Sequence, residues 1–256
     1  MSDQVQEAYV KRSTENSIST IEFFHPQSNS LPGKILNLLA EEITQAGQDK
    51  NASVIILKSG GAKAFCAGAS FDELIKIKNE EEGLVFFSGF AKVINAIRVC
   101  PKFVIARIQG KCVGGGVGLA AAVDYAIALD TADIKLSELA VGIGPFVVGP
   151  AVERKMGTSA FNSLAIDASS WRSSQWAFQN GLFSELHQNI DAVDAAVEKL
   201  AHTLSNSSPD AMKELKTIFW KGTEHWSQLL SERAAISGRL ILSDFSIKAI
   251  EKFKSK

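Results

Sequence analysis

Cysteine and histidine are scarce in this chain, and neither forms a cluster. The three cysteines, Cys66, Cys100 and Cys112, show no CxxC spacing, and an odd, low count argues against a disulfide framework and a zinc site. The four histidines are scattered, and no group of His, Asp and Glu residues has the spacing of metal ligands. We therefore predict no metal centre, and cysteines that serve as small core residues in a reducing compartment.

Long apolar runs and an excess of one charge are also absent. No run reaches the roughly 20 apolar residues that a membrane span requires, and the first residues are too polar for a secretory signal. The formal net charge is −1, without the basic face of a nucleic-acid-binding protein. The 256 residues are 46% hydrophobic and 21% charged, which permits a sizeable core. We expect a cytoplasmic globular protein with no membrane or nucleic-acid partner.

Strand-like and helical segments alternate in the first 150 residues. This alternation predicts an α/β fold. After Pro150 helix formers dominate, so we expect the α/β core to be followed directly by a helical C-terminal part. Apolar runs predict strands over 19–25, 53–58, 102–108 and 125–129, and helical spacing predicts helices over 31–46, 71–78, 84–97, 192–204, 210–220 and 227–242.

Two segments rich in small residues, 60–74 and 110–122, each follow a predicted strand and open a predicted helix. Such a geometry points free N–H groups and the positive end of the helix at one place. Glycine lets a ligand approach the backbone closely, so two converging amides could form an oxyanion hole. Alternatively, the glycines serve only tight turns and close packing. The second helix is apolar almost all round, which predicts that it is buried.

Nucleotide-binding and serine-hydrolase motifs fit these segments poorly. Cys112 and Leu119 break the two possible registers of GxGxxG, and the relaxed GxGxxA over 116–121 starts well past the end of its strand. Val117 follows Gly116 where a P-loop requires lysine, and no GxSxG elbow occurs. A phosphate-binding loop and a serine nucleophile therefore lose support.

Glu138 is the candidate acid or base. Residues 134–138 alternate between apolar and polar, and a strand through them would place Glu138 on the same face as Ile134 and Leu136. Burial on that face would raise the pKa of the carboxyl group, as general acid–base catalysis near neutral pH requires. The alternative is a strand that ends at Ser137 and leaves Glu138 in a solvated turn.

Three segments in this order, AFCAGASFDEL (64–74), GKCVGGGVGLAAAVDYAIA (110–128) and KLSELAVGIGP (135–145), resemble the crotonase, or enoyl-CoA hydratase/isomerase, family. The resemblance covers nearly the whole chain. It implies a crotonase-like ββα spiral core over 1–195, which binds a coenzyme A thioester and carries out catalysis, and a C-terminal helical trimerisation region over 196–256. It also implies a homotrimer or homohexamer, a role in fatty acid metabolism, and no cofactor, because coenzyme A is part of the substrate.

The resemblance assigns roles to individual residues. The backbone N–H groups of Ala69 and Gly115 would form an oxyanion hole for the thioester oxygen, and Glu138 would be the catalytic acid or base. Further residues would line the substrate path: Lys63, Ala64, Ala67 and Gly68 along coenzyme A, and Phe71, Gly114, Gly118 and Pro145 beside the substrate.

One departure from the family pattern concerns the mechanism. Enoyl-CoA hydratases commonly carry two glutamates, and Gly118 occupies the position of the first. A single carboxylate could move a proton between carbons, as in an enoyl-CoA isomerase, or activate water with help from a group such as Ser137. The string GGGVGL with LSE downstream resembles methylglutaconyl-CoA hydratases. Other enolate reactions (decarboxylase, hydrolase or thioesterase) and a non-catalytic CoA-binding protein stay open.

Overall fold

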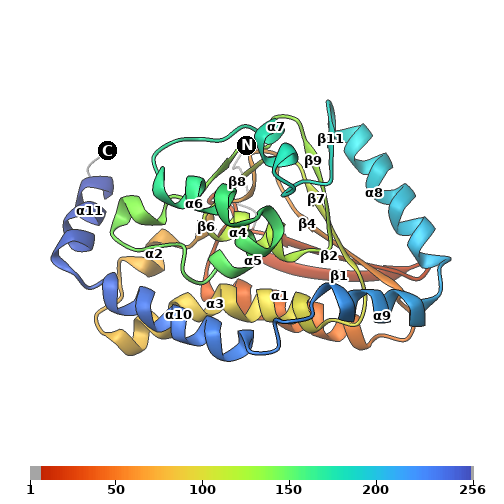
Figure 1. Ribbon diagram of the computed structural model, residues 1–256, viewed down its shortest axis with the longest axis horizontal. Coiled ribbons are helices and arrows are strands. Elements are labelled where there is room, and N and C mark those ends of the chain that lie inside the picture. Colours follow the sequence, from red (N-terminus) through yellow and green to blue (C-terminus); the bar gives the residue numbers. More distant parts are fainter. Residues whose placement is uncertain (1–6, 255–256) are drawn as a thin grey trace.

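A six-stranded sheet forms the base of the molecule. The computed structural model describes residues 7–254, the last two by their backbone alone. β1 and β2 form an antiparallel hairpin, and all other neighbouring strands of this sheet are parallel. The central strands are almost wholly apolar because both of their faces are covered. The sheet order (Figure 1) is β1 (Tyr9–Glu15), β2 (Ile18–Phe24), β4 (Val54–Ser59), β7 (Val104–Ile108), β9 (Tyr125–Leu129) and β11 (Glu185–His187).

Two small parallel sheets bring distant parts of the chain together. β5 (Ala64–Cys66) and β10 (Ile134–Lys135) pair on either side of β8 (Lys111–Val113), and β3 (Ser30–Leu31) pairs with β6 (Gly68–Ala69). The three segments that carry the family resemblance therefore become neighbours in space.

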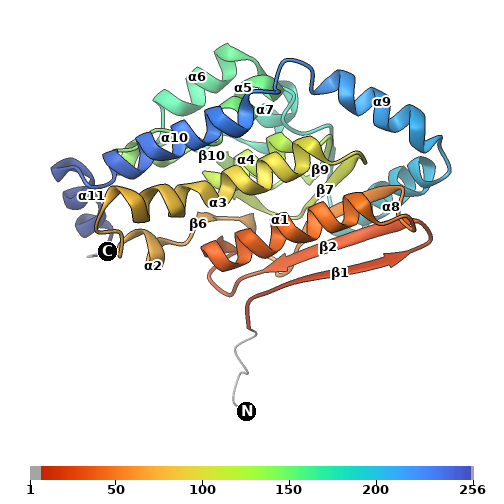
Figure 2. The ribbon, with the colours of Figure 1, turned by 90° about the horizontal axis from the view of Figure 1, so that it is seen from below.

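Helices cover both faces of the large sheet. α1 (Gly33–Gln48) and α3 (Glu80–Val99) lie on one face, and α10 (Trp226–Leu240) runs along α3 (Figure 2). α8 (Ile190–Ser205) packs on the opposite face, against β4, β7 and β9. The predicted α/β class is confirmed. The proposed division at residue 195 stays a prediction, and α8 runs across that position.

Among the remaining helices, α11 (Asp244–Lys254) packs on the short 3₁₀ helix η1 (Glu138–Val141). Gly142, just after η1, has no room for a side chain, since a Cβ there would overlap Ser246 of α11. Within residues 7–254 no helix is both long and apolar enough to cross a membrane. The bounds are α2 (Phe71–Leu74), α4 (Gly115–Ala122), η1 (Glu138–Val141), α5 (Gly149–Met156), α6 (Thr158–Ile166), α7 (Ser174–Gln179), α9 (Pro209–Phe219) and α11 (Asp244–Lys254).

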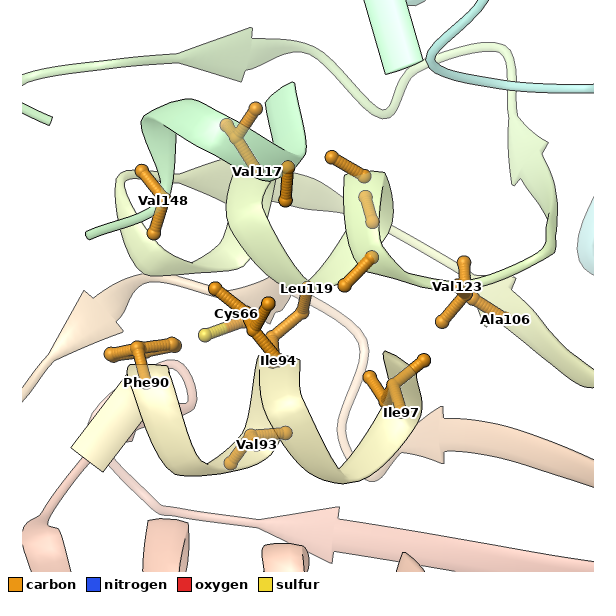
Figure 3. Packing of buried hydrophobic residues seen from close by; sticks show 14 of the residues in the cluster. Cys66, Phe90, Val93, Ile94, Ile97, Ala106, Val117, Leu119, Val123 and Val148 are labelled. Carbon is orange, nitrogen blue, oxygen red and sulfur yellow. The ribbon is translucent and has the colours of Figure 1, made fainter. Parts of the chain in front are cut away.

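α4 is wholly buried, as its apolar sequence predicts. Figure 3 shows Leu119 of α4 pointing toward Ile94 of α3. A Cβ at Gly115 would overlap the Phe90 ring of α3, and a Cβ at Gly116 would overlap the carbonyl oxygen of Cys66. Glycine at these positions therefore allows the start of α4 to lie directly on β5 and α3.

A buried ion pair connects the end of α4 to the C-terminal helices. Lys216 of α9 donates to Asp124 Oδ2 over 2.8 Å and to the carbonyl oxygen of Lys102 over 2.6 Å. Asp124 also accepts from the backbone N–H of Val104 (2.7 Å) and from Trp220 Nε1 (3.3 Å). The two charged side chains are only 8% and 3% exposed, Asp124 and Lys216 respectively. This network holds α9 against the sheet.

Candidate functional site

A cavity of about 390 Å³ lies where the three family-like segments meet. Strands β6 and β8 and the start of α4 form one part of its wall, and α2, α3 and the loop 143–148 form another. Most of the wall is apolar. The predicted site residues among the lining are Ala67, Gly68, Ala69, Phe71, Gly114, Gly115, Glu138 and Pro145.

The backbone amide of Gly115 begins helix α4. Gly114 precedes it with φ of +52°, a conformation that suits glycine, and its N–H donates to the carbonyl oxygen of Lys135 over 2.8 Å. Because the first N–H groups of a helix have no acceptor within the helix, the Gly115 amide and the helix dipole favour an anionic oxygen here.

Ala69 lies in a short strand whose neighbouring amides are occupied. The N–H groups of Ala67 and Ser70 donate to the carbonyl oxygens of Asn29 and Leu31, and that of Gly68 donates to Cys66 Sγ. These bonds fix the backbone on both sides of the Ala69 amide.

The two predicted amide donors come from segments in direct contact. A Cβ placed on Gly68 would lie 3.2 Å from the carbonyl oxygen of Val113 and 3.7 Å from the nitrogen of Gly115. The positive φ of Gly68, +92°, also favours glycine. Ala69 and Gly115 therefore line one cavity, although 46 residues separate them in the sequence. Their role as oxyanion donors stays a prediction.

The carboxyl group of Glu138 faces the same wall. A Cβ on Gly114 would lie 3.1 Å from Glu138 Oε1. Glu138 Oε2 is buried and has no hydrogen-bond partner within residues 7–254. Burial raises the pKa of Glu138 to about 7, although backbone hydrogen bonds at Glu138 and Ser137 act in the opposite direction. A carboxyl group with this pKa can exchange a proton near neutral pH.

The local structure around Glu138 differs from both sequence-based alternatives. The predicted strand ends at Lys135, and Glu138 is the first residue of η1, so the period-two argument was wrong for this position. The residue is partly buried, and its carboxyl oxygen Oε2 is fully buried. Gly114 lies against it, and this contact comes from a segment that local periodicity does not include.

Three predicted substrate-binding residues do not line the cavity. Lys63 and Ala64 are not among the lining residues, and the carbonyl oxygen of Ala64 accepts from Asn29 Nδ2 (2.9 Å) and Gln109 Nε2 (3.3 Å), a structural role. Gly118 is buried within α4, about one helical turn after Gly115, which lines the cavity.

The side chain of Val148 fills the space beside Gly118. A Cβ at Gly118 would overlap Val148 Cγ1 and lie 2.7 Å from Val148 Cβ. Val148 itself lines the cavity. An apolar side chain therefore lies where a side chain at position 118 would extend.

The contact predicts strong coupling between these two positions. Gly118→Ala should lower the free energy of unfolding by about 1–3 kcal/mol because the core is overpacked. Val148→Gly removes the overlapping atoms, so adding it to Gly118→Ala should cost less than the sum of the single changes. Urea unfolding of the two single variants and the double variant measures this coupling. Additive losses would show that the two side chains do not compete for space.

Several lining residues were not predicted as site residues. Phe86, Phe87 and Phe90 come from α3, and the helical spacing of 84–97 indicated only a packed helix. Ser237 comes from α10, about a hundred residues after Glu138. No local pattern connects these positions. The further unpredicted lining residues include Lys135, Phe146, Val148 and Trp171.

Comparisons with known proteins place the sequence in a family. The family model for enoyl-CoA hydratase/isomerase matches residues 13–252. The mitochondrial methylglutaconyl-CoA hydratase of Mus musculus is 32% identical over 200 residues, which span 77% of this chain and 63% of that protein. A Bacillus subtilis (strain 168) protein named as an enoyl-CoA hydratase/isomerase, YngF, is 31% identical over 203 residues, covering 78% and 76% of the two chains.

The fold is also shared with solved structures. The crystal structure of an enoyl-CoA hydratase from Bacillus halodurans superimposes with a TM-score of 0.88 at 22% identity, covering 95% of this chain and 99% of that one. This likeness confirms the predicted crotonase-like fold. Together with the match over residues 13–252, it shows that the chain belongs to the enoyl-CoA hydratase/isomerase family, as its three motif segments predict.

Proposed function

We propose that this protein is an enoyl-CoA hydratase or isomerase that acts on an acyl-CoA thioester through an enolate. One observation carries the proposal: Glu138, with its pKa raised to about 7, lies beside Gly114 in the cavity that Gly115 and Ala69 also line. The relatives named as hydratases and hydratase/isomerases support the same reaction type.

The chemistry follows from these positions. The thioester oxygen would accept hydrogen bonds from the N–H groups of Ala69 and Gly115, and each such donor typically contributes about 3 kcal/mol to stabilising the oxyanion. In an isomerase, Glu138 would remove a proton from one carbon to give the enolate and return it to another carbon. In a hydratase, Glu138 would take a proton from water as the water oxygen adds to the β-carbon, and the resulting enolate would be protonated at the α-carbon. The cavity supplies the low-dielectric surroundings in which the amides act strongly.

Gly118 carries no carboxylate, and Val148 fills the space beside it, so Glu138 is left without a second glutamate at that position. This bears on which reaction occurs. Moving a proton from one carbon to another requires a single carboxylate, which Glu138 would provide. Hydration requires Glu138 to act on water, and Ser137, which also lines the cavity, is a candidate hydroxyl group to help hold that water. The methylglutaconyl-CoA hydratases among the relatives support the hydratase alternative, with that acyl group as one candidate substrate.

A product assay decides among these reactions. Purified protein would receive crotonyl-CoA, 3-hexenoyl-CoA and 3-methylglutaconyl-CoA, with mass spectrometry and chromatographic separation of isomers. Addition of water to the first or third compound identifies a hydratase, and conversion of the second into its 2-enoyl isomer identifies an isomerase. If all three bind and none changes, the proposal is wrong, and the protein either performs another enolate reaction or only binds CoA thioesters.

The raised pKa of Glu138 predicts the pH dependence of the reaction. A base must be ionised to take a proton, so kcat/KM should rise with pH through about 7 and level off above it. Steady-state kinetics from about pH 5 to about pH 9 measures the profile of the free enzyme. A profile that is flat from about pH 6 to about pH 8 would contradict the assignment of Glu138 as the base.

We further propose that copies of the chain associate as homotrimers or homohexamers. The support is the exposure of large apolar side chains on two separate C-terminal helices: Leu215, Ile218 and Phe219 on α9, and Phe245 and Ile247 on α11. Light scattering coupled to size-exclusion chromatography measures the mass, and a monomer would contradict the proposal.

A further inference from the structure

Two lysines and one tryptophan form a cationic and aromatic surface at the cavity. The Nζ atom of Lys111 lies 4.6 Å from the centroid of the Trp171 ring, and that of Lys135 lies 5.7 Å from it. Both distances are within the range of a cation–π interaction. Lys135 and Trp171 line the same cavity as Glu138. We refer to Lys111, Lys135 and Trp171 as the lysine–tryptophan platform.

The small sheet β10-β8-β5 explains why these side chains converge. Val113 of β8 pairs with Lys135 of β10, and side chains two residues apart share a face, so Lys111, Val113 and Lys135 lie on one side. Cys112 and Ile134 are fully buried on the other side. An antiparallel bridge between Ile134 and Arg172 places Trp171 at the edge of the exposed face.

The two lysines of the platform carry positive charge that is not paired with a carboxylate in the described residues. Two ammonium groups at one ring repel each other, and the ring remains 44% exposed. An anionic oxygen between the lysines would remove this repulsion and form charge-assisted hydrogen bonds.

We propose that the lysine–tryptophan platform binds an anionic group, a carboxylate or phosphate, of the thioester ligand. The inference rests on the proposed function for the identity of that ligand. Lys135 and Glu138 are three residues apart and open into one cavity, so a carboxylate on the acyl group is within reach. The phosphates of coenzyme A supply the same chemistry from the other end of the ligand.

The test compares ligands that differ in charge and cannot undergo the reaction. Isothermal titration calorimetry would measure glutaryl-CoA, butyryl-CoA and butyryl-pantetheine binding to the full-length protein and to a Lys111→Met/Lys135→Met variant. Methionine keeps much of the apolar length of lysine and removes its charge. Lys92→Met is the matched control, because Lys92 is exposed on α3 and binds Asn37, away from the cavity. Trp171→Leu provides a second variant that retains both charges.

Two results would support the platform, and they identify the source of the anion. If the double variant weakens glutaryl-CoA binding about tenfold and leaves the two butyryl ligands unchanged, the anion is the acyl carboxylate. If both CoA thioesters weaken about equally and butyryl-pantetheine does not, the anion is a phosphate of coenzyme A. If each of the three ligands binds the double variant and Trp171→Leu as tightly as it binds the parent protein, the inference is overturned.

These binding experiments do not depend on turnover. Charge-dependent binding in a protein that converts no enoyl-CoA would retain the platform and reject the proposed reaction. Normal turnover with unchanged binding in the double variant would retain the reaction and reject the platform.

Discussion

Replacing Glu138 with Gln should lower kcat by about 10²–10⁴-fold while acyl-CoA thioesters still bind. The substitution keeps the size of the side chain and removes the group that accepts and returns a proton. The carboxyl group is buried, and its pKa of about 7 allows both protonation states near neutral pH, whereas an amide has neither. Steady-state kinetics with the substrate found by the product assay measures the loss, and calorimetry with butyryl-CoA measures binding.

A control glutamate separates loss of catalysis from a general effect of removing charge. Glu81 is exposed in the first turn of α3, outside the cavity, and Glu81→Gln should leave kcat unchanged. Circular dichroism of both variants checks that the fold is retained. Full activity of Glu138→Gln would remove Glu138 from the mechanism, and with it the main support for the proposed reaction.

Asp124→Ala should lower the free energy of unfolding by about 3–5 kcal/mol. The change leaves the ammonium group of Lys216 buried without its carboxylate and deprives the backbone N–H of Val104 and the indole N–H of Trp220 of an acceptor. An unpaired buried charge is costly, whereas the intact pair is close to neutral in its net contribution. Urea unfolding measures this loss.

A second variant tests this explanation directly. Asp124→Ala/Lys216→Met removes both charges, so it should be more stable than Asp124→Ala alone, despite carrying one more substitution. If the double variant is the less stable of the two, the penalty comes from lost hydrogen bonds and packing, and the unpaired charge is a minor cause.

The long apolar strands and the amphipathic helices were accessible from the sequence. The strand predicted over 125–129 has the bounds of β9, and the helix predicted over 192–204 lies within α8 (Ile190–Ser205). In both cases a single face or a continuous apolar run decides the structure. The α4 segment was predicted to be buried for the same reason, because a helix that is apolar all round has no face for solvent.

The edge strand β1 and the short strand β6 were not predicted, for two different physical reasons. β1 (Tyr9–Glu15) carries polar and charged side chains, as edge strands commonly do, and so resembles a polar terminus. β6 (Gly68–Ala69) is too short for a periodic pattern, and pairing with β3 stabilises it. The helix predicted over 71–78 ends at Leu74.

Some residues of the candidate site could be predicted from the sequence, and others could not. Ala69, Gly115 and Glu138 could be singled out from their motifs and from family resemblance, and the structure places all three on one cavity. Val148 and Trp171 could not, since each reaches the site through a contact with a segment far away in the chain. Tertiary contacts of this kind leave no periodic trace in the sequence.

The packing of α11 on η1 links the turn that carries Glu138 to the order of synthesis. A ribosome makes Ala69, Gly115 and Glu138 before the residues of α11 that lie against Gly142, and Ser246 follows Glu138 by 108 positions. Because folding proceeds from the N-terminus during translation, we expect the core around Ala69 and Gly115 to form before the turn that carries Glu138 is supported by α11. A chain interrupted before Asp244 would thus contain Ala69, Gly115 and Glu138 and lack the helix that packs on the turn of Glu138.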